Sequence, residues 1–246
     1  MTDLLLHHLH KFHLTRFDLK AVLFDMDGVL YDSMPAHDRS WQQTMDELGL
    51  KHLPHEFYLQ EGRIGRSTIH TIFRRNLQRD ASDGEVKRIY ARKSELFRQY
   101  NSGALIPGAA QVLEYVHSVG LTPVLVTGSG QPSLTERLDT YFPGMFTSET
   151  MVTAFDVERG KPDPEPYLKG LRKGGDLKPH QAVAIENAPL GIESAVRAGL
   201  FTVAVNTGPL PDSVLEEAGA ATVFASMCEL LKNLPVIFRA AREIRR

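Results

Sequence analysis

A short apolar run, Ala21–Phe24, leads directly into Asp25-Met26-Asp27-Gly28, and this transition constrains the fold more than any other feature of the chain. Four consecutive apolar residues that include valine and phenylalanine are typical of a strand buried on both faces. The carboxylates and the glycine that follow indicate a turn at the carboxyl end of this strand. Because open α/β sheets bind ligands at that end, Asp25 and Asp27 are candidates for a catalytic or metal-binding pair, although an ordinary acidic turn gives the same pattern.

Composition narrows the class of protein. The chain has 246 residues, of which 42% are hydrophobic, and this is enough for one large domain or two small ones. A formal net charge of −2 gives no electrostatic footprint for nucleic acid or an anionic membrane, and no apolar run is long enough to span a bilayer. A single cysteine, Cys228, excludes an intramolecular disulfide. We therefore expect a cytoplasmic protein that binds neither nucleic acid nor membrane.

Residues 1–19 are rich in leucine and histidine. They lack the basic start and the small-residue cleavage site that are typical of a signal peptide. The histidines have no acidic or cysteine partners at metal-ligand spacing, so a short amphipathic helix packed on the body is the better interpretation.

The stretch between residues 34 and 104 carries helical patterns and no clear strand. The patterns cover residues 37–48, 54–61, 67–78 and 83–100. So long a helical stretch after a single strand does not fit a simple alternation of strands and helices. It predicts a helical domain (34–104) inserted into a core domain (20–33 and 105–246), after an N-terminal extension (1–19).

From Pro107 onward, strands and helices alternate. Apolar runs at residues 122–127, 151–153, 182–185, 201–205 and 221–224 are typical of buried strands, and helical patterns separate them. Short connections in such an alternation predict a doubly wound, mostly parallel, Rossmann-like α/β sheet that is covered on both faces.

Polar residues follow three of the later strands. Thr127 and Gly128 open a helix, where free N–H groups favour an anion such as phosphate. Lys161 precedes two prolines that restrict the backbone, so its ammonium is held more rigidly than on an ordinary surface. Glu186 and Asn187 offer the hard oxygen ligands that suit Mg²⁺. Each pattern alone is common, but four in this order favour a phosphate and metal site.

These segments resemble the motifs of the haloacid dehalogenase superfamily of phosphohydrolases and phosphomutases, and the resemblance covers nearly the whole chain from Lys20. Residues 25–30 resemble the first motif, Thr127 the second, Lys161-Pro162 the third and Glu186-Asn187 the fourth. The helical insertion resembles the cap of the β-phosphoglucomutase-like subgroup. Mutases of that subgroup also carry His and Trp at the positions of His37 and Trp41.

The resemblance implies a role for each motif. Asp25 would be the nucleophile that forms an aspartyl-phosphate, and Asp27 the general acid and base. Phosphate oxygens would be held by Thr127, Lys161 and the backbone near Met26 and Gly128. Mg²⁺ would be held by Asp25, Asp27, Glu186 and Asn187. Family members more often carry a second acid at the position of Asn187, so the metal site is expected to lose one negative charge.

The substrate is less sharply defined. Arg66 and Lys93 align with basic cap residues of the mutases, and Arg63 is a further candidate, but Glu61 stands near a lysine of the mutases. We therefore expect a phosphatase that acts on a small phosphorylated metabolite such as a sugar phosphate, as a monomer or weak homodimer. A phosphomutase of the β-phosphoglucomutase type is the alternative, and a non-catalytic binding module is a third possibility.

Overall fold

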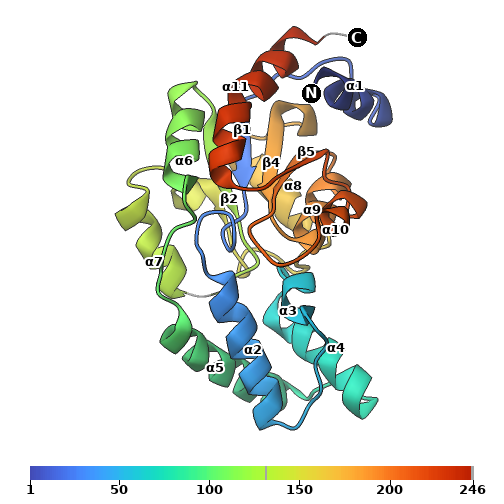
Figure 1. The fold of residues 1–246 in the computed structure, drawn as a ribbon, viewed down its shortest axis with the longest axis vertical. Helices are drawn as coiled ribbons and strands as arrows, with labels where there is room; N and C mark the ends of the chain where they lie inside the picture. Colours follow the sequence, from blue (N-terminus) through green and yellow to red (C-terminus); the bar gives the residue numbers. More distant parts are fainter. Residues whose placement is uncertain (131, 245–246) are drawn as a thin grey trace.

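The computed structural model describes residues 1–130 and 132–244, and its centre is a sheet of six parallel strands in the order β3-β2-β1-β4-β5-β6 (Figure 1). The strands are β1 (Ala21–Phe24), β2 (Thr122–Val126), β3 (Met151–Val152), β4 (Ala182–Glu186), β5 (Phe201–Val205) and β6 (Thr222–Phe224). β1 lies between β2 and β4, so the strand order reverses beside it. Ligands of such sheets bind in the crevice at this switch point. The predicted α/β sheet is confirmed.

Helices cover both faces of the sheet. They are α6 (Ala109–Ser118), α7 (Pro132–Tyr141), α8 (Glu165–Lys173), α9 (Pro189–Arg197), α10 (Asp212–Glu217) and α11 (Met227–Glu243). Successive side chains of β1 enter opposite layers, as the two-residue period of a strand requires. Val22 and Phe24 join the core cluster with α6 and α11, whereas Ala21 and Leu23 join the cluster with α8 and α9.

Four helices lie between β1 and α6 and form a separate group, which we call the helical insertion. They are α2 (Met34–Glu47), α3 (Glu56–Leu59), α4 (Gly65–Leu77) and α5 (Asp83–Tyr100). Apolar residues at helical spacing give the group its own core, which includes Trp41, Phe57 and Ile69. A capping box between Ser82 and Glu85 starts α5. Figure 1 shows the group beyond the end of the β1 arrow, where the strand ends meet.

Two adjacent chain segments join the helical insertion to the sheet. The N–H of Asp32 donates to the carbonyl of Ala104 at 2.9 Å, and the N–H of Ile106 donates to the carbonyl of Leu30 at 3.0 Å. Tyr31 and Leu105 thereby form an antiparallel bridge. The outgoing and returning segments are thus held side by side.

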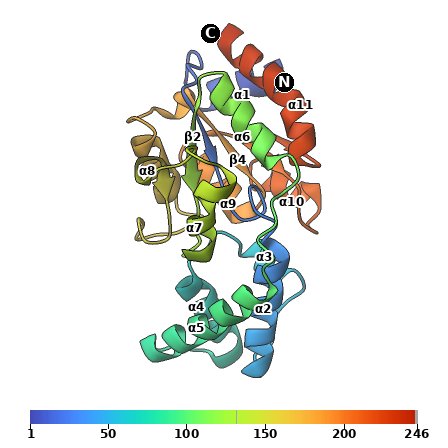
Figure 2. The same cartoon turned by 90° about the vertical axis from the view of Figure 1, so that its left-hand side faces the viewer.

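The N-terminal extension forms the expected helix, α1 (Thr2–Lys11), which packs against α11 (Figure 2). Leu5, His8 and Leu9 are the buried residues of this helix. Within the described part of the chain, no helix is both long and apolar enough to cross a membrane. The core range predicted from the sequence includes residues 131, 245 and 246, which lie outside the described residues.

Candidate active site

Asp25 and Asp27 lie on the turn that follows β1. The N–H of Asp25 continues the sheet ladder by donating to the carbonyl of Ile185 at 3.0 Å. Gly28 adopts a φ of 80°, which favours glycine, and its N–H donates back to the carbonyl of Tyr31 at 2.8 Å. Both carboxylates are buried, which is costly for two like charges unless cations or donors face them.

Lys161 supplies the nearest cation. Its Nζ lies 2.5 Å from Asp25 Oδ1 and 2.7 Å from Glu186 Oε1, and it also donates to the carbonyl of Val126 at 3.0 Å. Although burial lowers the pKa of Lys161, the charges of Asp25 and Glu186 outweigh it and raise the pKa above its ordinary value. Burial raises the pKa of Asp25 to about 8 against the attraction of this lysine. The structure therefore brings the predicted first, third and fourth motifs together.

The second motif joins them from the end of β2. Thr127 is buried, and its Oγ1 accepts a hydrogen bond from the N–H of Ser129 at 2.9 Å. A Cβ atom on Gly128 would overlap the carbonyl of Gly62 in the helical insertion. Only glycine at position 128 therefore permits the helical insertion to approach this strand end so closely. Met26 lies between the two aspartates with its side chain buried in the core.

Glu186 and Asn187 end β4 with different partners. Glu186 Oε1 also accepts from the Tyr167 hydroxyl at 2.7 Å, and Oε2 accepts from the N–H of Asn187 at 3.1 Å. The Nδ2 of Asn187 donates to both oxygens of Glu61, at 2.9 and 3.1 Å. The Oδ1 of Asn187 is buried without a hydrogen-bond partner. An amide oxygen left unpaired in a buried site is free to bind a cation.

Glu61 is the site residue that sequence reasoning did not assign. It belongs to the helical insertion, but its side chain is only 9% exposed because it enters the space beside Asn187. Burial, followed by the charge of Asp25, raises the pKa of Glu61 well above its ordinary value. Glu61 stands near the position where the mutases carry a lysine, and Asn187 stands where family members more often carry an acid. The first departure adds a carboxylate and the second removes one. Their coincidence was the available signal.

A chain of contacts connects Asp27 to the helical insertion. Asp27 Oδ1 accepts from the Ser33 hydroxyl at 2.5 Å and lies 3.2 Å from His37 Nε2. His37 Nδ1 lies 2.6 Å from the Nζ of Lys93. Burial lowers the pKa of Lys93 to about 7. Burial also lowers the pKa of His37.

Of the predicted cap residues, His37, Trp41 and Lys93 line one pocket together with Asp25 and Asp27. Arg66 does not line it: its side chain is 52% exposed and pairs with Asp83 at 2.7 Å. Arg63, three residues earlier, lies in the turn that precedes α4 and lines the pocket. Which of the two arginines reaches the pocket depends on how this turn and α4 are placed on the strand ends, and the sequence alone does not give that placement.

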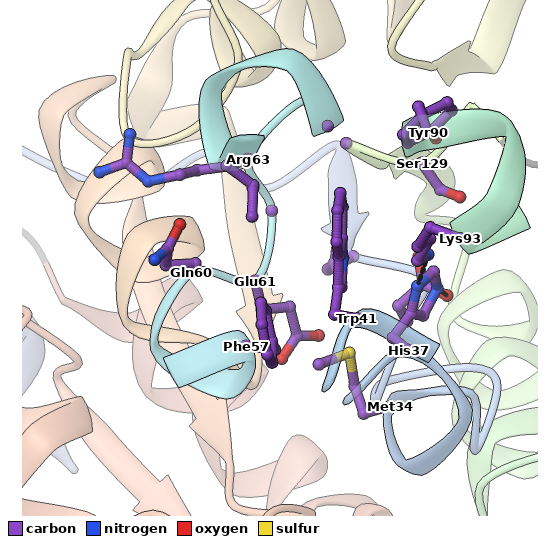
Figure 3. A pocket seen from close by; sticks show the side chains of 16 residues that line it. Met34, His37, Trp41, Phe57, Gln60, Glu61, Arg63, Tyr90, Lys93 and Ser129 are labelled. Atoms are coloured by element: carbon purple, nitrogen blue, oxygen red, sulfur yellow. Dashed lines mark hydrogen bonds and ion pairs between the residues drawn. The ribbon is translucent and has the colours of Figure 1, made fainter. Parts of the chain in front are cut away.

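The pocket is small and lies between the helical insertion and the strand ends. Its volume is about 60 Å³, room for a few water molecules. Figure 3 shows Trp41 near its middle, His37 and Lys93 to one side, and Glu61, Gln60 and Arg63 to the other. A phosphoryl group with a compact leaving group fits such a space, whereas a larger substrate requires the helical insertion to withdraw.

The donor set suits a hard cation. Among the described residues, no cluster of three His, Cys, Asp or Glu side chains is arranged as a ready metal cage. The oxygens near this point are the unpaired Asn187 amide oxygen, the Glu61 carboxylate that contacts the Asn187 amide, and the Asp25 carboxylate, whose charge acts on Glu61. Carboxylate, amide and carbonyl oxygens are the ligands that Mg²⁺ and similar ions prefer. Burial, together with the charges of neighbouring carboxylates, raises the pKa values of Asp25 and Glu61, and a bound cation would offset both effects.

The fold and this site define a known class of protein. Residues 19–199 match the family model of haloacid dehalogenase-like hydrolases, and the chain belongs to this family. Hydrolases of the family are generally metal-dependent.

Individual relatives are sugar phosphatases and mutase-like proteins. The chain is 32% identical to hexitol phosphatase A of Escherichia coli over 188 residues, which are 76% of this chain and 83% of the phosphatase. It is 28% identical to 2-deoxyglucose-6-phosphate phosphatase 1 of Saccharomyces cerevisiae, over 88% of this chain and 92% of the phosphatase. A solved structure from Bacteroides vulgatus, assigned provisionally as a β-phosphoglucomutase, is 49% identical with a TM-score of 0.94 and covers 98% of each chain.

Proposed function

We propose that this protein is a Mg²⁺-dependent phosphohydrolase that removes the phosphoryl group from a small phosphorylated metabolite, of the sugar phosphate kind. The observation that carries the proposal is that Asp25 and Asp27 line one pocket while the Nζ of Lys161 lies 2.5 Å from Asp25 Oδ1. The relatives that are sugar phosphatases support the substrate class.

Asp25 is the nucleophile in this proposal. Its carboxylate oxygen attacks phosphorus, the bond from phosphorus to the leaving oxygen breaks, and an aspartyl-phosphate forms. Lys161 lies against the same carboxylate and would neutralise charge on the phosphoryl oxygens, together with the Thr127 hydroxyl and the N–H of Gly128. Because Asp25 lies at the end of a buried strand, its carboxylate has a fixed position for in-line attack on phosphorus.

Asp27 is the general acid and base. It gives its proton to the departing oxygen, and then takes a proton from the water that attacks the aspartyl-phosphate and releases inorganic phosphate. The Ser33 hydroxyl and the His37 ring fix its orientation. Because His37 and Lys93 belong to the helical insertion, Asp27 has this full set of partners only when the helical insertion lies against the sheet.

The cation would be held by Asp25, the main-chain carbonyl of Asp27, Glu186 and Asn187, with Glu61 as an added ligand from the helical insertion. When bound, it would neutralise charge on the phosphoryl group and on the carboxylates around it. Glu61 would restore the negative charge that the site loses by having Asn187 in place of an acid.

The structural similarity to the Bacteroides vulgatus protein favours one second candidate, a phosphomutase of the β-phosphoglucomutase type. A mutase must bind a bisphosphate, whose second phosphate lies on the side of the helical insertion. Glu61 adds a carboxylate of the helical insertion to the pocket, and Lys93 is already engaged by His37. Both features disfavour a second phosphate, so the hydrolase is preferred.

A substrate panel tests the proposal. It contains p-nitrophenyl phosphate, inorganic pyrophosphate, glycerol 1-phosphate, hexitol phosphates, and β-glucose 1-phosphate with a trace of glucose 1,6-bisphosphate. We expect release of inorganic phosphate that depends on Mg²⁺. Faster formation of glucose 6-phosphate than of free phosphate would support the mutase, and no turnover of any compound would support the binding module.

Asp25→Asn should lower kcat on every accepted substrate by roughly 10³-fold or more, because the amide cannot attack phosphorus. Asp83→Asn, on the exposed start of α5, is the matched control and should keep full activity. Circular dichroism would verify that both variants fold. Retained turnover in Asp25→Asn would remove the nucleophile assignment.

A further inference from the structure

Tyr167 lies on the face of α8 that packs against the sheet, and its side chain is fully buried in the core cluster that includes Leu23 and Val126. A Cβ atom on Gly170, one turn further along α8, would lie 2.7 Å from the Val126 side chain, so α8 approaches the sheet closely there. The hydroxyl of Tyr167 reaches the strand ends from this side of the sheet, and the mechanism proposed above gives it no role.

Two donors share one oxygen of Glu186. Its Oε1 accepts from the Tyr167 hydroxyl and from the Nζ of Lys161, each at 2.7 Å. The ring of Tyr167 faces the same ammonium, with its centroid 5.3 Å from Nζ. Lys161 also donates to Asp25 Oδ1 at 2.5 Å and to the carbonyl of Val126 at 3.0 Å. An ammonium has three N–H groups, so these three acceptors use all of them.

The balance of charge around Lys161 changes during the proposed reaction. When an oxygen of Asp25 forms its bond to phosphorus, negative charge passes from that carboxylate to the phosphoryl group and the leaving oxygen. Glu186 is then the carboxylate that still attracts Lys161 at hydrogen-bond distance. A buried ammonium and a buried carboxylate attract each other strongly. Lys161 would therefore move onto Glu186, away from the phosphoryl oxygens, unless a second donor satisfied the Glu186 oxygen.

We propose that Tyr167 is a positioning residue: its hydroxyl satisfies Glu186 Oε1, so that Lys161 can follow the charge from Asp25 to the phosphoryl group. This inference rests on the proposed phosphohydrolase function and adds to it a residue from outside the four motifs. The hydroxyl acts through Glu186 and Lys161 and does not touch the substrate. Its effect belongs to the transition state, because the charge of Asp25 balances that of Glu186 before the attack.

Tyr167→Phe tests the proposal because it removes the hydroxyl and keeps the buried ring. With p-nitrophenyl phosphate and Mg²⁺, we expect kcat to fall about tenfold while KM stays within about twofold of the value for the unsubstituted enzyme. Orthovanadate can adopt the five-coordinate geometry of phosphorus under attack, so it should inhibit the variant about tenfold less strongly. Inhibition by inorganic phosphate, which has no such geometry, should change by less than about twofold.

Tyr115→Phe is the matched control. Tyr115 is half-buried on α6, on the other face of the sheet, where its ring stacks on Phe238 with the centroids 6.1 Å apart. This variant should keep kcat, KM and both inhibition constants. Thermal unfolding would verify that both variants fold.

Two results would overturn the proposal: an unchanged kcat in Tyr167→Phe, or an equal loss of affinity for orthovanadate and for phosphate. A lower Tm with full kcat would show that the hydroxyl only stabilises the fold. Failure of the proposed function gives a different result, namely no hydrolysis by the unsubstituted enzyme, and this inference then fails with it.

Discussion

At the scale of single residues, the main departure from the family pattern is the position of one carboxylate: it is missing at residue 187 and present at Glu61. An amide stands at position 187, and a carboxylate from the helical insertion, Glu61, contacts it through two hydrogen bonds. The number of carboxylates near the expected cation is therefore preserved, although one of them now belongs to a different part of the chain.

Exchanging the carboxylate at position 61 and the amide at position 187 tests whether Glu61 replaces the missing acid as a cation ligand. Glu61→Gln should weaken Mg²⁺ binding by roughly 10- to 100-fold, because one anionic ligand is lost. Adding Asn187→Asp to that variant should restore much of the affinity, since the new carboxylate can still accept a hydrogen bond from the new amide. The measurement is calorimetric titration with Mg²⁺, supported by the Mg²⁺-dependent shift in Tm. If Glu61→Gln binds Mg²⁺ as tightly as the unsubstituted protein, Glu61 is not a ligand.

The part of the site that follows strand ends could be predicted from the sequence. Asp25, Thr127 and Glu186 meet because the carboxyl ends of parallel strands share one edge of the sheet, whatever the details of packing. Glu61, Arg63 and Arg66 depend instead on how the helical insertion rests on that edge. Their placement is a tertiary property with no local signal, and so Arg66 was expected at the pocket while Glu61 was not assigned.

At the scale of elements, α1 is an amphipathic helix that packs one face against the core around the sheet. Its buried face includes His8, whose ring packs near Phe12, Phe17 and Phe201, with centroid distances of 4.6, 5.7 and 5.5 Å. The His8 Nε2 atom is buried without a partner. A histidine in such a place is held in its neutral form.

Because of His8 in α1, the free energy of unfolding should decrease as the pH is lowered. Burial lowers the pKa of His8 from 6.5 to about 4, so the unfolded chain binds the proton more readily than the folded one between these values. Stability should therefore fall as pH decreases from 6.5 to 4, by up to about 3 kcal/mol from this residue. Urea unfolding of the unsubstituted protein and of His8→Leu, at several pH values, isolates the effect. His10→Leu, exposed on the same helix, should keep the pH dependence of the unsubstituted protein; an identical dependence in His8→Leu would contradict the prediction.

Most helices and strands could be predicted from the sequence. The six strands were expected at their observed places because buried parallel strands are short apolar runs between helical patterns. Boundaries were less accurate: α2 begins at Met34, ahead of the first expected residue at 37, because Pro35 is tolerated in the first turn of a helix.

At the scale of the whole molecule, one turn of the helical insertion brings its backbone directly onto the strand ends. Gly62 packs on the side chain of Lys161, and its carbonyl lies against Gly128. Glycine at these places lets the turn that carries Glu61 descend onto the strand ends, which shields the site from bulk water.

Gly62→Ala should prevent this approach. The added Cβ would overlap the Lys161 side chain, and its φ of 85° is unfavourable for alanine. We expect kcat/KM to fall by roughly 10- to 100-fold, because the catalytic groups no longer reach their working positions. Gly84→Ala, at a place with no atom within 4 Å, is the matched control and should retain full activity. Steady-state kinetics with p-nitrophenyl phosphate would measure both, and full activity in Gly62→Ala would show that this close approach is dispensable.

The paired segments at Tyr31 and Leu105 have a consequence for how such a molecule can diversify. The helical insertion leaves the sheet and returns to it at neighbouring points, joined by a 2.9 Å hydrogen bond between Asp32 and Ala104. A different group of helices could occupy the same place without altering the path of any strand. Most residues that perform the chemistry lie on the sheet and can then change separately from those of the helical insertion, so that one sheet can serve many phosphate esters by exchange of the inserted helices.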